Sequence, residues 1–518
     1  MNITSVSLLC HDSSICTIKD GTIDMYQMEE RFSRIKHDPR IDKIIENISS
    51  FDIKKIYLTS TINYDVDFVF TNHIKKKNYN PLIKKYCIEL FNEHHLYHAF
   101  CGFYNSNYDE CIVIIVDGMG KEFNIDDIKL NEMETIYLMN KTTKTIKILY
   151  SKFYNKIINK KITKNKIISN ENSVGIKFEE KSKEFNFSFL DGAGKIMGLA
   201  QYKNNKDKLQ YPYNTKEWKE RVDEAYGLQQ ETQNYVLNLI QKYIEETGVK
   251  NVVISGGYGL NCVANYHYLK NLKDINLYID PVCFDAGISI GAAYYHYIQE
   301  TQNNPPIKPL QNVYIGHQEE TYDLKNLQTQ KVSYEDIVNL ILQKNIVALF
   351  QGKSEAGQRA LGNRSLLFDP RVMNGKDIVN QIKKRENFRP FAGSILQEEA
   401  SKWFDMLSLK ESPYMQYAMN SYENAIEQAP AIIHADNTCR IQTVTQEQNQ
   451  HFYSLISCFF EKTGVPMLLN TSFNLGGEPL VETFNHAVYT LKNSMIEYLY
   501  LPEIETLVTI KNKKLSYQ

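Results

Sequence analysis

The sequence predicts a two-domain α/β protein, and three observations support this. The chain has 518 residues, too many for one ordinary hydrophobic core. Short apolar strands alternate with segments of helical periodicity in both halves. Between the halves, residues 303–309 hold two asparagines and three prolines, which is typical of a linker. We therefore expect one domain over residues 1–332 and a second over residues 333–518.

Bulk composition narrows the function classes. The chain is 43% hydrophobic and 23% charged, as in soluble globular proteins, and its net charge of −2 provides no field to attract nucleic acid. No apolar run approaches the roughly 18 residues that cross a bilayer, and the first residues lack the basic region of a signal peptide. Nine cysteines without a Cys-x-x-Cys pair favour free thiols. We expect a cytoplasmic protein with neither a nucleic-acid nor a membrane partner.

Short apolar runs predict the strands of the first half. Alternation or continuous burial predicts strands at 5–10, 15–18, 23–28, 53–58 and 111–116. Asp20-Gly21 is a turn signal between the second and third of them. The lysine- and asparagine-rich segment 141–183 is expected to form a solvated hairpin or loops.

Helical spacing predicts the elements that follow. Apolar residues recur at helical intervals over 232–247, Gly248 would end that helix, and 252–255 starts a strand. Residues 287–297 predict a small-residue helix that packs closely on a sheet. A further strand is expected at 346–350.

Histidines and aspartates suggest a metal site. His94 and His98, at positions i and i+4, would share one helical face and could bind one ion. Asp117 directly follows the predicted strand 111–116, and Asp285 precedes the small-residue helix. By itself the pattern is weak, since surface histidine pairs are common and the aspartates also suit turns or helix caps.

Glycine-containing turns suggest a nucleotide site. Asp117–Gly120, Ser255–Gly259 and Asp285–Gly287 each follow an apolar strand, and a fourth glycine segment is Gly192–Leu199. Backbone N–H groups at such turns can cradle phosphates, although a single glycine pair is more often a plain turn. The P-loop pattern is absent.

Four polar loops in the second half suggest an anion pocket. They are rich in cations and amides and comprise residues 354–365, 383–391, 439–440 and 470–474. Arginine forks bind phosphates and carboxylates at two points, so a compact anionic ligand is expected. The alternative is a solvated basic surface. Lys384 and Arg385 are assigned to that alternative, as a wet helix end.

These motifs, with His11-Asp-Ser-Ser14 and Glu30–His37, resemble the NodU/CmcH/TobZ family of O-carbamoyltransferases from about His11 to Ala487. The resemblance implies a Kae-type (TsaD-like) domain of the actin, heat-shock chaperone and sugar-kinase fold over residues 1–332. It implies a YrdC-like α/β domain over residues 333–518. The implied activity moves a carbamoyl group from carbamoyl phosphate to an acceptor hydroxyl, through a carbamoyl-adenylate made with ATP.

The resemblance also implies residue roles. A divalent metal (iron, zinc or manganese) would be held by His94, His98, Asp117 and Asp285. ATP would contact Lys195, Gly256, Gly257 and Gly287. His11 and Asp12 would lie near the acceptor, with His11 either the general base or a histidine that only bonds its loop. Carbamoyl phosphate would meet Arg359, Lys383, Arg389, Arg440, Ser472 and Asn474. His434 would act in catalysis or in structure.

Two departures from the family pattern are visible. The family's Glu-Phe-Gly-Pro-Arg is Glu355-Ala-Gly-Gln-Arg359, and its Phe-Ala-Pro-Ser is Phe391-Ala-Gly-Ser394. Neither change removes a charged group, so activity is still expected.

Several alternatives stay open at this level. A tRNA threonylcarbamoyl-transfer enzyme shares both component folds, but an acidic tRNA favours a more basic partner. A carbamoylating hydrogenase maturation factor would carry Cys-x-x-Cys zinc motifs. A non-catalytic nucleotide-binding scaffold would be expected to lose the arginines or metal ligands. The acceptor could be an aminoglycoside, a cephem, a Nod-type oligosaccharide, another sugar or a nucleoside.

Overall fold

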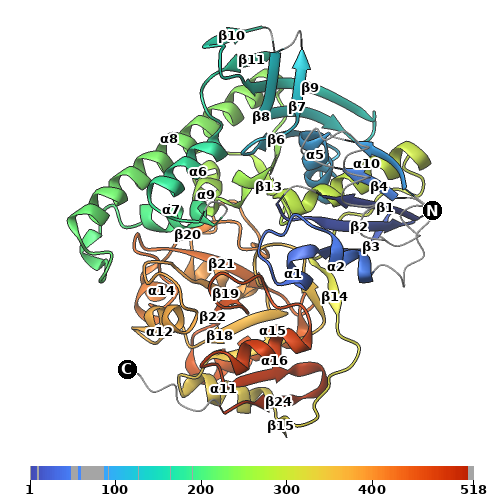
Figure 1. The fold of residues 1–518 in the computed structure, drawn as a ribbon. Coiled ribbons are helices and arrows are strands. Elements are labelled where there is room, and N and C mark those ends of the chain that lie inside the picture. The colour runs from blue at the N-terminus through green and yellow to red at the C-terminus, as the bar shows by residue number, and fades with distance from the viewer. Residues whose placement is uncertain are drawn as a thin grey trace. The chain divides into compact units, whose positions relative to one another are not determined.

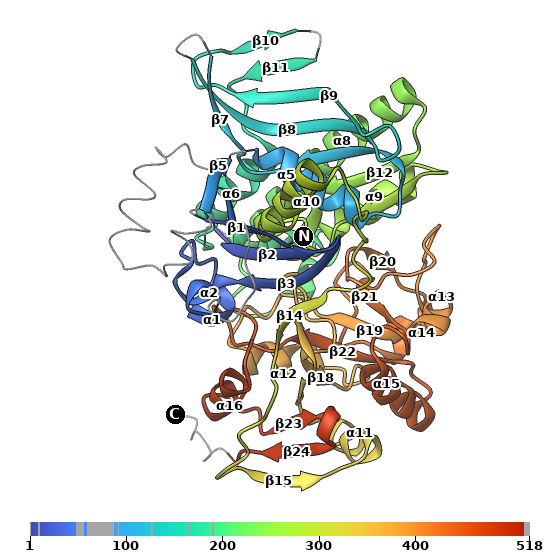
Figure 2. The ribbon, with the colours of Figure 1, turned by 90° about the vertical axis from the view of Figure 1, so that its right-hand side faces the viewer.

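Chain contacts divide the molecule into two compact units (Figures 1 and 2). The computed structural model describes residues 2–8, 11–47, 56–59, 87–91, 93–125, 128–163, 165–188 and 191–511. The first unit comprises Met1–Gly192, Glu231–Leu260 and Asn271–Ile315. The second comprises Ala193–Gln230, Asn261–Lys270 and Gly316–Gln518. The second unit thus begins at Gly316, ahead of the expected residue 333, and it also includes two earlier segments of the chain.

The first unit contains a five-stranded sheet in the order β3-β2-β1-β4-β5. Its strands are β1 (Asn2–Ser7), β2 (Ser14–Lys19), β3 (Thr22–Met28), β4 (Ile56–Thr59) and β5 (Cys87–Phe91). The first three are antiparallel neighbours, whereas β4 runs parallel to β1 and β5 parallel to β4. The predicted turn at Asp20-Gly21 is confirmed. Residues 9–10 and 53–55 of the predicted strands lie outside the described residues.

A second sheet in this unit has the order β10-β11-β9-β8-β6-β12-β13, with β7 beside β8. Its strands are β6 (Glu110–Val116), β7 (Glu122–Ile125), β8 (Ile128–Asn140), β9 (Thr145–Tyr154), β10 (Lys160–Ile162), β11 (Lys166–Ser169), β12 (Asn251–Ser255) and β13 (Asn276–Ile279). Strands β9-β8-β6-β12-β13 repeat the order and directions of the first sheet. This repeated topology supports a duplicated fold, although the sequence shows no internal repeat. The Kae-type assignment stays a prediction.

Two buried helices pack on these sheets. Helix α10 (Ile288–Thr301) packs on β1, β2 and β4, and helix α5 (His94–Asn105) packs on β6, β8 and β12. The two helices also pack against each other. A Cβ on Gly291 would lie 1.8 Å from the carbonyl oxygen of Tyr97, so only glycine allows the approach.

Several expectations for this part of the chain are wrong in detail. Segment 141–183 contains β9, β10 and β11 but also most of helix α6 (Val174–Glu184). Helix α8 (Lys216–Thr247) begins well before residue 232. The glycine segment 192–199 is no turn but most of helix α7 (Gly192–Ala200). The predicted linker packs on the β2–β3 turn, where the Lys308 N–H donates to the Gly21 carbonyl at 2.8 Å.

The second unit is built on a nine-stranded sheet in the order β15-β24-β23-β16-β18-β22-β19-β21-β20. Its strands are β15 (Gln328–Lys331), β16 (Val347–Phe350), β18 (Arg364–Phe368), β19 (Ala392–Leu396), β20 (Ala418–Asn420), β21 (Thr438–Val444), β22 (Met467–Ser472), β23 (Tyr498–Leu501) and β24 (Thr506–Thr509). Strand β17 (Lys353–Glu355) pairs instead with β14 (Tyr314–Gln318). The longer helices of the C-terminal segment are α11 (Tyr334–Leu342), α12 (Gly375–Ile382), α15 (Gln450–Thr463) and α16 (Phe484–Lys492). Across the described ranges, no helix is both long enough and apolar enough to cross a membrane.

Candidate functional site

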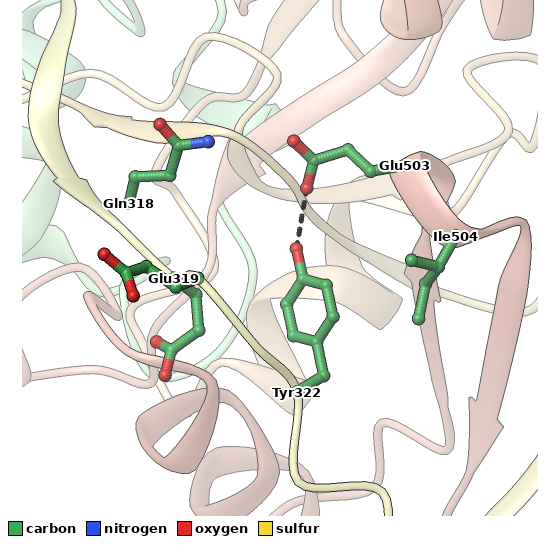
Figure 3. A pocket seen from close by; sticks show the side chains of 6 residues that line it. Gln318, Glu319, Tyr322, Glu503 and Ile504 are labelled. Carbon is green, nitrogen blue, oxygen red and sulfur yellow. Dashed lines mark hydrogen bonds between the residues drawn. The ribbon is translucent and has the colours of Figure 1, made fainter.

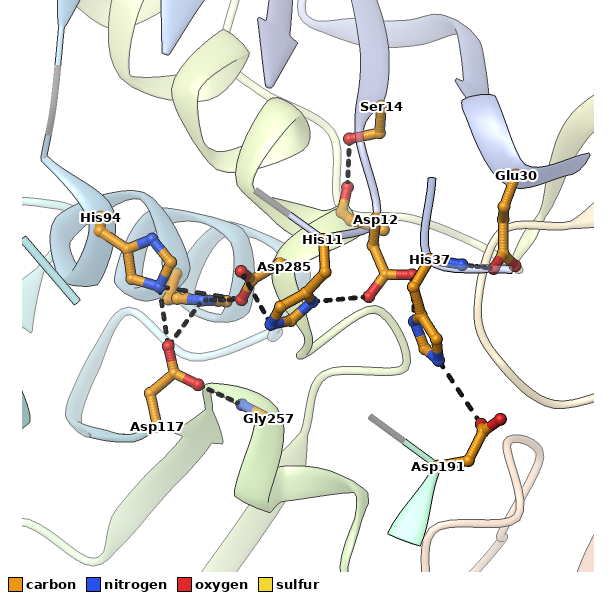
Figure 4. Close-up of polar contacts among 12 residues, drawn as sticks. His11, Asp12, Ser14, Glu30, His37, His94, Asp117, Asp191, Gly257 and Asp285 are labelled. Carbon is orange, nitrogen blue, oxygen red and sulfur yellow. Dashed lines mark hydrogen bonds and ion pairs between the residues drawn. The ribbon is translucent and has the colours of Figure 1, made fainter. Parts of the chain in front are cut away.

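Four metal-ligand side chains meet in the first unit (Figure 4). His94 and His98 lie on the first turns of α5, Asp117 directly follows β6, and Asp285 opens a short 3-10 turn ahead of α10. All four residues are buried, and one ligand atom from each lies within 4.8 Å of the others. Strand and helix ends therefore bring together residues that are up to 191 positions apart in sequence.

The hydrogen bonds within the cluster satisfy only some of its polar atoms. The Nε2 atom of His94 donates to Oδ2 of Asp117 at 2.7 Å and lies 3.8 Å from Oδ1 of Asp285. The Nε2 atom of His98 lies 3.5 Å from the Asp285 carboxylate and 3.8 Å from that of Asp117. Among the described residues, His98 Nε2 has no hydrogen-bond partner although the side chain is buried.

These residues fit a divalent metal ion. A buried ring nitrogen without a partner normally requires a ligand, and here it faces two carboxylates. Two imidazoles and two carboxylates suit iron, zinc or manganese, and the donor set does not choose among them. His95 lies outside the cluster, because its Nδ1 contacts Thr135 Oγ1 at 2.7 Å and burial lowers its pKa well below the usual value.

The carboxylates and imidazoles of the cluster favour each other's charged forms. Burial opposes ionisation of Asp117, but the hydrogen bond from His94 and the nearby imidazoles hold the pKa of this carboxyl well below its usual range. Burial likewise opposes a charge on His94, whereas Asp285 and Asp117 raise the pKa of the ring. Asp117 is therefore ionised and available as a ligand at neutral pH.

The glycine turns lie against the same aspartate. The Gly257 N–H donates to Oδ1 of Asp117 at 3.3 Å, and Gly256 has a φ of +89°. A Cβ on Gly256 would lie 2.4 Å from the Val116 carbonyl oxygen, and a Cβ on Gly175 would lie 2.6 Å from the Gly118 backbone. Gly118, Gly175 and Gly256 therefore let three backbone segments converge beside the cluster.

Helix α6 begins at this convergence, a contribution that sequence reasoning missed. Ser173 caps the helix by accepting from Ile176 N–H and donates to the Gly118 carbonyl at 2.6 Å. Ser173, a residue type that favours the N-cap position, could have predicted the start of this helix from the sequence. Gly287 is explained by packing, because a Cβ there would lie 2.0 Å from the Val282 carbonyl oxygen.

His11 and Asp12 adjoin the metal-ligand cluster. His11 Nε2 lies 3.6 Å from Oδ2 of Asp285, and its Nδ1 donates to Oδ2 of Asp12 at 2.9 Å. The other oxygen of Asp12 accepts from Nδ1 of His37 at 2.9 Å, and His37 Nε2 lies 3.5 Å from Asp191. The sequence singled out the segment that ends at His37 but assigned no role to His37 or Asp191.

In the second unit, one carboxylate organises the loop that carries Arg359. Oε1 of Glu355 accepts from the N–H groups of Leu361 and Asn363, both at 2.8 Å, and of Arg364 at 3.2 Å. Arg359 is half-buried within this loop. Glu355 thus keeps the loop closed, although its neighbours Ala356 and Gln358 depart from the pattern of the resembled family.

Two other arginines in or near this loop, Arg364 and Arg371, are structural. Arg364 is fully buried, donates only to main-chain carbonyls such as that of Gln351 at 2.5 Å, and stacks on Phe350 at 3.7 Å. Arg371 pairs with Asp369 through two hydrogen bonds. Arg359 is the remaining candidate.

Lys383, Ser472 and Asn474 come together as one group. Lys383 Nζ donates to the main-chain carbonyl and Oγ of Ser472, and to both the carbonyl and Oδ1 of Asn474, the last two at 2.9 Å. Lys383 is 2% exposed, and these four acceptor oxygens are uncharged. This buried charge joins the end of α12 to the loop after β22.

Arginines 385, 389 and 440 form a second cationic group. Burial first, then the charges of Arg389 and Arg440, lower the pKa of Arg385 well below its usual range. Among the described residues, Arg440 Nε is buried without a hydrogen-bond partner. The adjacent carboxylate, Glu386, already pairs with Lys195 at 2.5 Å. Arg389 lies 3.7 Å from the same carboxylate. Positive charge in this group therefore exceeds the negative charge beside it, which favours binding of an anion.

This group corrects two expectations. Arg385 is no wet helix end, since it stacks on Phe391 at 4.1 Å and donates to the Pro390 carbonyl at 3.2 Å. Lys384 is exposed as expected. Lys195 belongs to the second unit, rather than to the glycine turns with which the sequence grouped it. A hollow of about 400 Å³ is lined by residues 384–387 with Pro212 and Tyr213.

His434 has both ring nitrogens engaged. Nε2 donates to the Phe391 carbonyl at 3.1 Å, and Nδ1 contacts Thr438 Oγ1 at 3.0 Å and Gln201 Nε2 at 3.2 Å. Burial lowers the pKa of His434 to about 4, so the ring is neutral at pH 7. These contacts favour a role in holding the wall beside Arg440 over one in proton transfer.

A further hollow in the second unit is acidic (Figure 3). Glu319, Glu320, Tyr322 and Glu503 line it with Gln318 and Ile504. Glu319 accepts from the Phe484 N–H at the start of α16, and Glu503 accepts from Tyr322 Oη. Two of its three carboxylates thus serve the fold, and the hollow does not suit an anionic substrate.

Comparison with known families matches most of the chain. Residues 44–294 match the family model described as "Carbamoyltransferase N-terminus". Residues 338–507 match the model described as "Carbamoyltransferase C-terminus".

Several curated proteins are similar. An uncharacterised protein of Synechocystis sp. is 29% identical over 96% of this chain and 95% of its own length. The nodulation protein NolNO of Sinorhizobium fredii is 27% identical over 94% of this chain and 78% of that protein. The 3'-hydroxymethylcephem-O-carbamoyltransferase of Streptomyces clavuligerus is 28% identical over 58% of this chain and 61% of that enzyme.

Solved structures give weaker likenesses. Full-length HypF in its phosphate- and nucleotide-bound form is 15% identical, with a TM-score of 0.37 over 57% of this chain and 56% of that chain. The ROK hexokinase of Thermus thermophilus is 11% identical, with a TM-score of 0.31 over 57% of this chain and 100% of that chain. Neither likeness is strong enough to define the fold.

The cluster predicts about one divalent ion per chain. Replacing His94 and His98 together by alanine removes two of the four ligands, so the ion should be lost on dialysis while the far-ultraviolet circular dichroism stays unchanged. His267→Ala, outside the cluster, should keep the ion. Elemental analysis of the three proteins checks this, and a metal-free wild type purified with iron, zinc and manganese supplied would contradict it.

The contacts of His37 predict a pH-dependent stability. Burial opposes its charge, but the hydrogen bonds that the ring donates to Asp12 and Asp191 raise the pKa of His37 from 6.5 to about 9. The charged His37 ring therefore stabilises the folded protein fully below about pH 6.5, by roughly 3 kcal/mol. This stabilisation is lost as the pH rises through about 9. The free energy of unfolding of the wild type in urea should exceed that of the His37→Asn variant at pH 6.5. The two values should become nearly equal by pH 10. A difference that grows with pH would contradict this.

Proposed function

Because this chain belongs to the carbamoyltransferase family, we propose that it transfers a carbamoyl group from carbamoyl phosphate to an acceptor hydroxyl, through a carbamoyl-adenylate made with ATP. The observation that carries the proposal is the pairing of two unlike sites in one chain. The first unit holds a buried metal-ligand cluster beside glycine turns, and the second holds guanidinium groups in excess of their carboxylates. An adenylating step and an anion-splitting step call for these two environments.

The cations of the second unit suit carbamoyl phosphate. Arg359, Arg389 and Arg440 would bind its phosphate, and Arg385 would keep the local charge positive. Water then divides the substrate into carbamate and inorganic phosphate, and the guanidinium groups neutralise the charge that grows on the departing phosphate. Lys383 has its hydrogen bonds in the protein, so its part is to hold the Ser472–Asn474 loop in place.

The first unit suits adenylation and transfer. Carbamate attacks the α-phosphate of ATP and displaces pyrophosphate, and the backbone N–H groups of the glycine turns after β6 and β12 are candidates to bind the phosphate chain. His94, His98, Asp117 and Asp285 would hold a divalent metal, which when bound supplies Lewis-acid polarisation. His11 Nε2 takes the proton of the acceptor hydroxyl as its oxygen attacks the carbamoyl carbon, and AMP leaves. Carbamate must be sheltered between the steps, because it decomposes in water.

Similar proteins indicate the class of acceptor. The cephem enzyme carries its acceptor in its name, a hydroxymethyl group on a small molecule. We propose a small hydroxylated acceptor for this chain too. A panel of an aminoglycoside, a hydroxymethylcephem, a chitin oligosaccharide, glucose and adenosine, supplied with carbon-labelled carbamoyl phosphate and ATP, tests this proposal. Transfer of label to none of these alcohols, with ATP cleaved to ADP instead, would place the chain among kinases or ATPases.

The cationic group predicts specific losses. Arg359→Ala and Arg389→Ala should each cost at least about 2 kcal/mol in kcat/KM for carbamoyl phosphate, roughly 30-fold, because each removes a charge-assisted contact to the phosphate. Lys402→Ala, which removes an exposed lysine paired with Glu399, should change kcat/KM by less than about twofold. Equal losses in all three variants would show that the pocket lies elsewhere.

Two steps in series predict a product before any acceptor is present. Carbamoyl phosphate and ATP together should yield phosphate and pyrophosphate without an alcohol, and ATP alone should yield little of either, since carbamate is the attacking group. Arg359→Ala should stop pyrophosphate release. His11→Ala should still release pyrophosphate but fail to carbamoylate the alcohol. Pyrophosphate assays under these four conditions decide the order, and release that requires the alcohol would overturn it.

A further inference from the structure

Asp12 serves two histidines at once (Figure 4). One carboxylate oxygen accepts from Nδ1 of His11 and the other accepts from Nδ1 of His37, both at 2.9 Å. Asp12 itself is 2% exposed, so water cannot readily replace either ring. Each oxygen of the carboxylate thus has one strong, charge-assisted partner.

His37 is in turn held from three directions. Its main-chain N–H donates to Glu30 Oε2 at 3.0 Å, and its Nε2 lies 3.5 Å from Asp191, which also accepts from Lys36. Its Nδ1 donates to Asp12. A histidine with both ring nitrogens facing carboxylates cannot rotate without breaking an ion pair, so its position is well defined.

The backbone at both ends of this contact is strained. Asp12 has a φ of +68° and His37 a φ of +56°, in the left-handed region that side chains other than glycine rarely adopt. Such conformations cost free energy and persist where the surroundings require them, most often at functional sites. Here the strain places the Asp12 carboxylate between the two rings.

The contact decides which nitrogen of His11 faces the reaction. Donation of Nδ1–H to Asp12 fixes the orientation of the His11 ring, so that Nε2 is the nitrogen that lies 3.6 Å from Asp285. The same logic operates wherever a carboxylate holds a catalytic histidine in one tautomer. A carboxylate that could turn away from Nδ1 would allow the other tautomer and a rotated ring.

We infer that His37 is a positioning residue for the transfer step: it holds Asp12, and Asp12 holds His11 with Nε2 toward the acceptor. This inference rests on the proposed function and deepens it. His37 does not touch the substrate. Its hydrogen bond to Asp12 is the one that matters for transfer, whereas its contact with Asp191 only anchors the ring.

Two isosteric variants separate these contacts. In His37→Asn the amide nitrogen replaces Nδ1 and can still donate to Asp12, whereas in His37→Gln it replaces Nε2 and can donate only to Asp191. Both variants lose the ring and its charge, so they are matched. His451→Asn, a change of the same kind at a residue of the second unit outside the proposed sites, is the control for effects of mutation and purification.

The assays use the full-length protein, carbon-labelled carbamoyl phosphate and ATP. The nucleophiles are the panel alcohol that is carbamoylated fastest and hydroxylamine, which attacks without a general base. We expect His37→Gln to lower kcat for the alcohol on the order of 30-fold with little change in KM, and His37→Asn by less than about fivefold. Hydroxyurea formation from hydroxylamine, and pyrophosphate release without a nucleophile, should stay within about twofold in both variants.

Each other outcome overturns the inference in a recognisable way. Equal alcohol kinetics in the Asn and Gln variants would show that the Asp12 contact has no special part. Loss of hydroxyurea formation or pyrophosphate release in His37→Gln would show that His37 supports the fold or the adenylating site instead. A wild type that releases no pyrophosphate from carbamoyl phosphate and ATP would overturn the proposed function, and this inference with it.

Discussion

Burial of two carboxylates beside two histidines is the constraint on which the first unit depends. Asp117 and Asp285 are removed from water, and an isolated buried carboxylate would be strongly unfavourable. The close crossing of α5 and α10, which Gly291 permits, brings the start of one helix to the start of the other and so sets His94 and His98 opposite Asp285. The backbone convergence at Gly118 and Gly256 then forms around Asp117.

The second unit presents the opposite electrostatic problem. Cations gather there with too few carboxylates, and the pKa of Arg385 falls because burial disfavours its charge and because neighbouring guanidinium groups repel it. By contrast, the charge of Arg364 is absorbed by main-chain carbonyls and an aromatic ring, and that residue closes the loop rather than binding a ligand. An arginine's function is thus decided by whether the protein already supplies its acceptors. Among the described residues, Arg440 Nε has no hydrogen-bond acceptor, so Arg440 is a candidate to bind a ligand.

Local patterns predicted much of this correctly because they depend on near neighbours in sequence. The i and i+4 spacing placed His94 and His98 on one helical face, and the apolar runs located β2, β3, β6, β12 and β16 to within a few residues. The errors fall where local patterns compete. Helix α8 begins at Lys216, and its first half buries Val222 and Ala225, a sparser apolar pattern than the one over 232–247 that predicted the helix. The glycines of α7 suggested a turn, yet tertiary packing outweighed their low helix propensity.

The sequence by itself determined the alternating α/β character, the candidate metal ligands and the cation-rich loops, because these are properties of residue type and short-range spacing. Only the tertiary structure decided which of the candidates meet. In the structure Asp12 bonds to His37, and Lys195 pairs with Glu386. Arg385 belongs to the cationic group, whereas Arg364 bonds to main-chain carbonyls. The Asp12–His37, Arg385–Arg440 and Lys195–Glu386 interactions join residues that are 25, 55 and 191 positions apart. Such contacts are set by strand order and helix crossing, and no local pattern encodes them.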